Sequence, residues 1–170
     1  MSIRLQPGEE IRFQETQRFI QNRLLQVILA LDALVTTLIL FVIAATQTGP
    51  QGDRIILVVW VVCVLLIPAL IFAAGMKTVI TDRRLVVRWM PPLPGRDVPL
   101  ERIISAEPVT FAPLSEGGWG WRISPTYHRL FNVAGNEGVH VRLGEGRREQ
   151  FLLGSQRAEA LAASLRAEKS

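Results

Sequence analysis

The sequence predicts an α+β protein, in which a transmembrane helical hairpin precedes an antiparallel β-barrel or sandwich closed by one C-terminal helix. Three observations predict it: two long apolar runs near the N-terminus, short strand-like segments after them, and one amphipathic segment at the end. The chain has 170 residues, enough for one modest domain and a membrane segment. Of these residues, 49% are hydrophobic, which is high for a soluble domain.

The two apolar runs, 24–46 and 55–75, each have about the length of a helix that spans roughly 30 Å of hydrocarbon. A core helix of this length would carry a polar stripe, and neither run has one. The first run is also longer than the roughly 7–15-residue apolar region of a signal peptide. We therefore predict a polar lead-in at 1–23 and a transmembrane hairpin at 24–76.

The distribution of basic residues predicts the orientation of this hairpin. The connecting loop offers only Arg54, which lies beside Asp53. The other basic residues near the hairpin flank it on both sides: Arg4, Arg12, Arg18, Arg23, Lys77, Arg83, Arg84 and Arg88. Because basic residues concentrate in cytoplasmic segments, we expect a multi-pass protein of the cell (inner or plasma) membrane with both termini cytoplasmic.

In residues 77–170 the apolar residues recur at a shorter spacing, and we predict that this segment is a cytoplasmic domain. Short strands are expected, separated by turns rich in proline and glycine, around 78–81, 84–89, 103–109, 139–143 and 147–153. The lead-in segment EEIRFQETQRF alternates enough to add a strand to this domain or to lie along the membrane surface.

The last segment predicts a helix that covers an opening of the sheet. Ser155 is a good N-cap. Apolar residues then recur at i, i+3, i+4 and i+7, namely Ala158, Leu161, Ala162 and Leu165.

Four phrases of the domain resemble a known family. ITDRRLVVRW (80–89) and VPLERIISAEPV (98–109) resemble the first hairpin and next strand of bacterial pleckstrin-homology-like (PH-like) domains. GGWGWRI (117–123) and LLGSQRAEALAASL (152–165) resemble phrases of small bacterial membrane proteins. In that family a two-helix hairpin precedes a cytoplasmic PH-like domain, which is the fold that the resemblance implies here. Inositol-phosphate specificity does not transfer, because the first hairpin loop is a bare Asp82-Arg83 turn.

The GGWGWRIS stretch contains the first candidate binding site. In an extended strand, Trp119 and Trp121 would point to the same face. That face either packs on the core or is an exposed aromatic pair that docks a partner or sits among lipid headgroups. Trp119, Trp121 and Arg122 are therefore candidate partner-binding residues. Nucleic acid is not an expected partner, since Arg122 and Arg129 are too few to form a phosphate track.

Two further candidate sites concern the membrane. Asp32 lies inside the first run, where an acid costs roughly 2.5–3.5 kcal/mol on insertion scales, and Thr36 shares its face. The pair either fixes helix packing or an oligomer, contacts a larger membrane partner, or relays protons or ions. Lipid headgroups are candidate ligands of Lys77, Arg83, Arg84 and Arg88, each worth about 1 kcal/mol near an anionic leaflet. A solvated face is the alternative for these four residues.

Catalysis has little support in the sequence. Cys63, the only cysteine, lies in the second run, and His128 and His140 have no obvious ligand partners. We expect no enzyme activity, metal or cofactor, and predict a membrane-anchored interaction module, an adaptor or accessory subunit of a larger membrane assembly. Its partners would be membrane lipids and either a membrane protein or a second copy. The alternatives are an anionic-lipid-sensing module and a structural subunit of a transporter-like oligomer.

Overall fold

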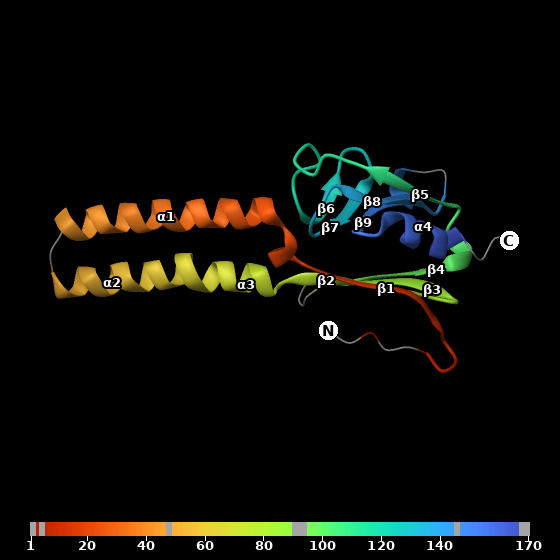
Figure 1. Cartoon of the computed structure of the whole chain (residues 1–170), viewed down its shortest axis with the longest axis horizontal. Helices are drawn as coiled ribbons and strands as arrows, with labels where there is room; N and C mark the ends of the chain where they lie inside the picture. Colours follow the sequence, from red (N-terminus) through yellow and green to blue (C-terminus); the bar gives the residue numbers. More distant parts are fainter. Residues whose placement is uncertain (1–2, 4–5, 47–48, 90–94, 145–146, 167–170) are drawn as a thin grey trace. The chain divides into compact units, whose positions relative to one another are not determined.

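The computed structural model of the chain describes residues 3, 6–46, 49–89, 95–144 and 147–166. The chain divides into two units, Phe19–Ala74 and a second unit formed by Met1–Arg18 together with Gly75–Ser170 (Figure 1). The first unit is helical and the second contains all the strands.

The helical unit is a hairpin of two long apolar helices. A short turn, η1 (Phe19–Gln21), leads into α1 (Arg23–Thr46), and α2 (Pro50–Trp60), η2 (Val61–Leu66) and α3 (Ile67–Ala73) form one continuous helix. Both 24-residue helices, Arg23–Thr46 and Pro50–Ala73, are long and apolar enough to cross a membrane. Only 0% and 6% of their most apolar windows are buried, unlike the core helix of a soluble protein.

The local sequence explains where these helices begin and where the second one becomes π-helical. Asn22 caps α1, because its Oδ1 accepts a hydrogen bond from the Leu25 N–H (3.0 Å). Pro50 occupies the first turn of α2, where a missing N–H costs nothing, so this helix begins before the predicted residue 55. The π-helical η2 ends at Leu66, two residues before Pro68, whose ring removes one backbone hydrogen bond from the helix.

The first sheet of the second unit is antiparallel, in the order β1-β2-β3-β4. Its strands are β1 (Ile11–Arg18), β2 (Gly75–Thr81), β3 (Arg84–Trp89) and β4 (Arg96–Pro99). Every second residue of β1 is buried, beginning at Phe13 and including Glu15 and Gln17. Of the two alternatives for the lead-in, the structure therefore has the added strand.

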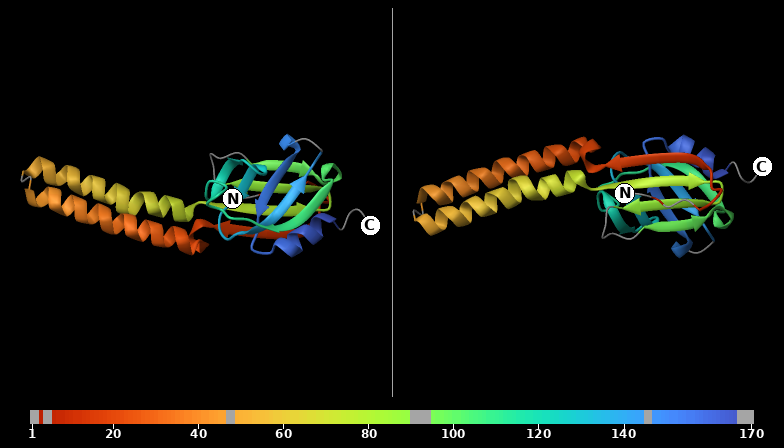
Figure 2. Two further views of the ribbon diagram at one scale, coloured as in Figure 1. Left: turned by 90° about the horizontal axis from the view of Figure 1, so that it is seen from above. Right: turned by 90° about the horizontal axis from the view of Figure 1, so that it is seen from below.

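The second sheet has the order β5-β8-β9-β7-β6 and is antiparallel except for the parallel pair β7–β9. Its strands are β5 (Ser105–Thr110), β6 (Gly120–Ser124), β7 (His128–Asn132), β8 (Glu137–Arg142) and β9 (Gln150–Gly154). Figure 2 shows this sheet from above and the first sheet from below. No strand of one sheet pairs with a strand of the other within the described residues, so the barrel alternative is wrong and two separate sheets are formed.

The C-terminal helix α4 (Ala158–Arg166) packs against β1, β5 and β8. Its four predicted apolar positions are all buried, which confirms the periodicity of the sequence. Ser155 lies three residues before the first residue of α4, and its Oγ accepts a hydrogen bond from the Arg157 N–H (3.0 Å). Glu15 of β1 adds a second acceptor, since its carboxylate binds the Ser155 hydroxyl (2.5 Å) and the Gln156 N–H (2.9 Å).

Candidate functional site

The GGWGWRIS stretch is not one continuous strand. Gly117, Gly118 and Gly120 have φ angles of 92°, 96° and 111°, in the left-handed region that favours glycine. Trp119 therefore lies in a loop between left-handed glycines, whereas Trp121 lies in β6. The expectation that the two tryptophans share one face of a continuous strand is wrong for this reason.

The two indole rings also differ in exposure. Trp119 is half-buried, and its Nε1 is buried with no hydrogen-bond acceptor among the described residues. Trp121 is 38% exposed, so the interpretation that both rings pack into the core is wrong. Two neighbouring apolar side chains are more exposed still, Leu114 at 67% and Ile123 at 73%. We call Leu114, Trp121, Arg122 and Ile123 the β6 surface.

Arg122 lies across the glycine loop. A Cβ atom at Gly117 would lie 3.3 Å from Arg122 Nη1, and one at Gly120 would lie 3.3 Å from Nη2. Burial lowers the pKa of the Arg122 guanidinium from its ordinary value. Its Nε is buried without an acceptor, and its side chain has no ion pair within the part of the chain that the structure describes. The glycines thus leave room for a guanidinium that remains available to an outside acceptor.

A buried carboxylate holds the β6–β7 hairpin to the loop before it. Glu116 is 9% exposed and accepts hydrogen bonds from the hydroxyls of Ser124 and Thr126, the latter at 2.7 Å. Ser124 Oγ in turn accepts the N–H groups of Thr126 (3.1 Å) and Tyr127 (2.9 Å). The β6 surface is therefore presented by a fixed hairpin. This role of Glu116 was not predicted, and the Ser-Pro-Thr turn at 124–126 is the local signal that indicates it.

A small apolar cluster packs against Tyr127 of the turn between β6 and β7. It consists of Phe111, Leu130 and Leu152, with Val109 and Tyr127 packed against it. Leu130 and Leu152 are cross-strand neighbours in the parallel pair β7–β9. This pairing, which joins segments far apart in the sequence, gives β7 its place in the sheet and gives β6 the outermost position.

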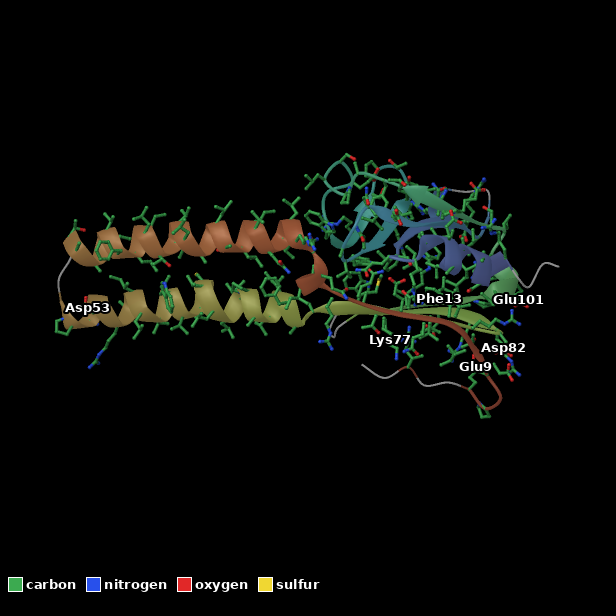
Figure 3. All side chains as sticks on the ribbon, viewed as in Figure 1. Glu9, Phe13, Asp53, Lys77, Asp82 and Glu101 are labelled. Atoms are coloured by element: carbon green, nitrogen blue, oxygen red, sulfur yellow. The ribbon has the colours of Figure 1, made fainter. Side chains whose placement is uncertain are left out.

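The four predicted lipid-binding residues do not form one cluster. Lys77 and Arg88 face each other across β2 and β3, whereas Arg83 and Arg84 lie at the turn end of that hairpin. Figure 3 shows Lys77 and Asp82 at opposite ends of β2. At about 3.3 Å per residue, the segment from Lys77 to Thr81 separates the two pairs by roughly 13 Å. The four residues therefore divide into two pairs, one at each end of the β2–β3 hairpin.

Three of these four residues are also held by carboxylates. Arg84 binds Glu9 (2.8 Å) and Asp97 (3.2 Å), and Arg88 binds Asp97 through Nη2 (2.9 Å). Arg83 lies 3.7 Å from its neighbour Asp82, and of the four only Lys77 has no ion pair among the described residues. Hydrogen bonds from Arg84 and from the backbone N–H of Gln6 lower the pKa of Glu9 to about 2.

Asp32 and Thr36 occupy α1 without binding each other. Asp32 is exposed, and its side chain has no hydrogen bond or ion pair with any described residue, while Thr36 is half-buried. The polar link between the helices is elsewhere: Trp60 Nε1 donates a hydrogen bond to Thr37 Oγ1 (2.9 Å). Thr37 Oγ1 also donates to the Ala33 carbonyl (2.7 Å).

The two histidines lie in different strands, His128 in β7 and His140 in β8. His140 Nε2 is 3.0 Å from Gln150 Oε1, and its ring meets Tyr127 edge-on with centroids 5.1 Å apart. His128 begins β7 with a left-handed φ of 61°. Among the described residues, no group of three or more His, Cys, Asp or Glu side chains is placed to hold a metal ion.

In comparisons with protein-family models, curated proteins and solved structures, nothing matches this chain. The architecture itself is two long apolar helices, two β-sheets and a C-terminal helix packed on the sheets.

Proposed function

We propose that this protein is a non-catalytic, membrane-anchored interaction module whose β6 surface docks a partner. The observation that carries the proposal is the exposure of Trp121 and Ile123 on β6 and of Leu114 in the loop before it, all within ten residues of the sequence. Trp121 and Ile123 lie on the same face of β6, and exposed apolar side chains that lie together mark interaction sites more often than singly scattered ones do. Tryptophan and arginine, which are consecutive residues of β6, are also among the residue types enriched at interface hot spots.

The rest of the proposal concerns location. The two apolar helices would anchor the chain in the cell (inner or plasma) membrane, and the basic residues around them favour cytoplasmic termini. The sequence phrases similar to those of small bacterial membrane proteins favour a PH-like domain for the sheet unit. Two sheets with a C-terminal helix packed on them are compatible with that fold. The module would then act as an adaptor or accessory subunit of a larger membrane assembly.

Lipid sensing by the predicted basic residues has less support. Carboxylates already bind Arg84 and Arg88, so their attraction to an anionic leaflet is reduced. Lys77 is the one member of that group without an ion pair among the described residues.

A second candidate function, a structural subunit of a transporter-like oligomer, is favoured by Asp32. An acid near the middle of a membrane span needs a hydrogen-bond partner, and the described part of this chain offers it none. A second copy or another membrane protein would supply that partner. If Asp32→Asn and Asp32→Ala both leave the oligomeric state in native membranes unchanged, this candidate is wrong.

Affinity capture from native membranes tests the main proposal. The tagged full chain is solubilised in mild detergent beside its Trp121→Ala variant, and bound proteins are quantified by mass spectrometry. Ile104→Ala is the matched control, because Ile104 is an exposed apolar residue (56%) in a different part of the same unit. We expect a partner that is lost from Trp121→Ala and retained by Ile104→Ala. A set of bound proteins that is identical in all three samples would contradict the proposal.

A further inference from the structure

The four edge strands of the two sheets differ in how they are protected. The edge of β1 is occupied by α4, and Arg157 Nη2 donates a hydrogen bond to the Gln14 carbonyl (2.6 Å). The β5 edge contains Pro108 and also packs against α4. The β4 strand has only four residues and ends in Pro99. Short length, proline and a covering helix are the usual devices that prevent an edge from pairing with another chain.

The β6 edge, a strand of five residues, lacks within the described part of the chain the proline and the packed helix that protect the other edges. It is the outermost strand of its sheet, contains no proline, and pairs only with β7 among the described residues. The outward N–H and C=O groups of β6 therefore remain free to bond to an added strand. Trp121 and Ile123 are exposed on this same strand, which makes the edge apolar as well as unpaired.

The two faces of β6 differ in chemistry. Trp121 and Ile123 share one face, opposite Phe131 and Arg129 of β7. Arg122 projects to the other face, opposite Leu130. A strand added at the free edge would place its alternate side chains about 4.5–5.5 Å from these three residues. Apolar side chains would complement Trp121 and Ile123.

On the added strand, the side chain between the two apolar ones would have to accept hydrogen bonds from the Arg122 guanidinium. The guanidinium has a buried Nε without an acceptor and is free of any ion pair in the described residues. A carboxylate matches the planar fork of a guanidinium and binds it through two parallel hydrogen bonds. A neutral side chain would leave part of this desolvated charge unpaired.

We propose that β6 accepts an extended segment of a partner protein as a further strand of its sheet, with the side-chain pattern apolar–acidic–apolar. This inference rests on the proposed function, because it names the chemistry of the partner at the same surface. Main-chain hydrogen bonds supply affinity in such strand addition, and the alternating side chains supply specificity. The acidic side chain pairs with Arg122, and the two apolar side chains cover Trp121 and Ile123.

A second copy of β6 is a poor match for the same edge. The strand GWRIS contains no acidic residue. Antiparallel pairing of two such strands would place Gly120, Ser124 or a second Arg122 beside Arg122. None of these neutralises the guanidinium, and like charges directly opposite each other are destabilising.

Synthetic peptides test the inference with the full chain in detergent micelles. The probe peptide has the central sequence Thr-Val-Glu-Val-Thr, and matched peptides carry Gln or Lys in place of Glu. Binding is measured by peptide fluorescence anisotropy, and the position of binding by backbone amide shifts. We expect the Glu peptide to bind about tenfold more tightly than the Gln peptide, as a charged hydrogen bond requires. The largest amide shifts should occur in Gly120–Ser124. The Arg122→Glu variant should reverse the preference toward the Lys peptide.

Each of the other outcomes overturns the inference. Equal binding of the Glu and Gln peptides would contradict the pairing of an acidic side chain with Arg122. Amide shifts centred on β4 or β5 would contradict binding at the β6 edge. No binding of any peptide to the wild-type chain would contradict strand addition itself, whether or not Arg122→Glu folds. If Trp121-dependent capture from membranes persists in that case, the proposed function stands and only the strand inference fails. If capture is also independent of Trp121, both fail.

Discussion

Replacing Glu116 should release the β6–β7 hairpin from the loop that precedes it. The Glu116 carboxylate accepts two hydroxyl hydrogen bonds, and hydrogen bonds to a charged group contribute about 1.5–3 kcal/mol each. Ser124 is 1% exposed, so its hydroxyl would lose its acceptor in a buried place, whereas Thr126 is exposed and can turn to water. The Ser124 bond therefore dominates, and we expect Glu116→Ala to cost about 2–3 kcal/mol in local stability.

Hydrogen exchange of the β6 and β7 backbone amides in the full chain measures this loss. A cost of about 2–3 kcal/mol corresponds to exchange that is roughly 30- to 150-fold faster for amides that open with the hairpin. The amides of β2 and β3 in the other sheet should be unchanged. Glu107→Ala is the matched control, because Glu107 is an exposed glutamate of β5. Exchange in Glu116→Ala that stays within about threefold of the wild type would refute the reasoning.

Three further predictions concern other parts of the chain. Because the pKa of Glu9 is lowered from 4.5 to about 2, its stabilising effect is present above pH 4.5 and is lost as the pH falls toward 2. Acid unfolding should therefore show a smaller loss of stability over that interval in Glu9→Gln than in the wild type, and equal slopes would contradict this. Gly154→Ala would push a Cβ atom against Asn132, and a drop in Tm corresponding to about 1–3 kcal/mol is expected. An unchanged Tm would show that Asn132 yields without cost. Trp60→Phe removes the hydrogen bond to Thr37 and should weaken the helical hairpin by about 0.6 kcal/mol in detergent unfolding, and a loss above about 2 kcal/mol would indicate a further role for the indole.

The spacing of apolar residues predicted the helices and strands that depend only on residues near each other in the sequence. The two apolar helices, the α4 face from Ala158 to Leu165 and strands such as Arg84–Trp89 all follow from residue spacing. The β6–β7 hairpin did not, because left-handed glycines interrupt the alternation at Trp119 and the partner of β7 lies in β9. A parallel pairing between distant segments leaves no short-range signal.

Only part of the candidate site was predicted, and the rest was missed for similar reasons. Trp121 and Arg122 were identified from residue type, but the exposure of Leu114 and Ile123 depends on the position of β6 in the sheet. The basic residues were placed together because they are close in sequence. Their ion pairs with Glu9 and Asp97 form across strands and across the lead-in, which sequence distance does not reveal.

The central claim is that the exposed β6 surface is where this protein meets its partner. The most direct test introduces a photo-crosslinking amino acid at Ile123 or, as the control, at Ile104 of the full chain in native membranes. The account predicts an adduct with a distinct protein from position 123, reduced in the Trp121→Ala background, and no such adduct from position 104. Adducts that are equally frequent at both positions, or that contain only lipid or a second copy of the chain, would contradict it.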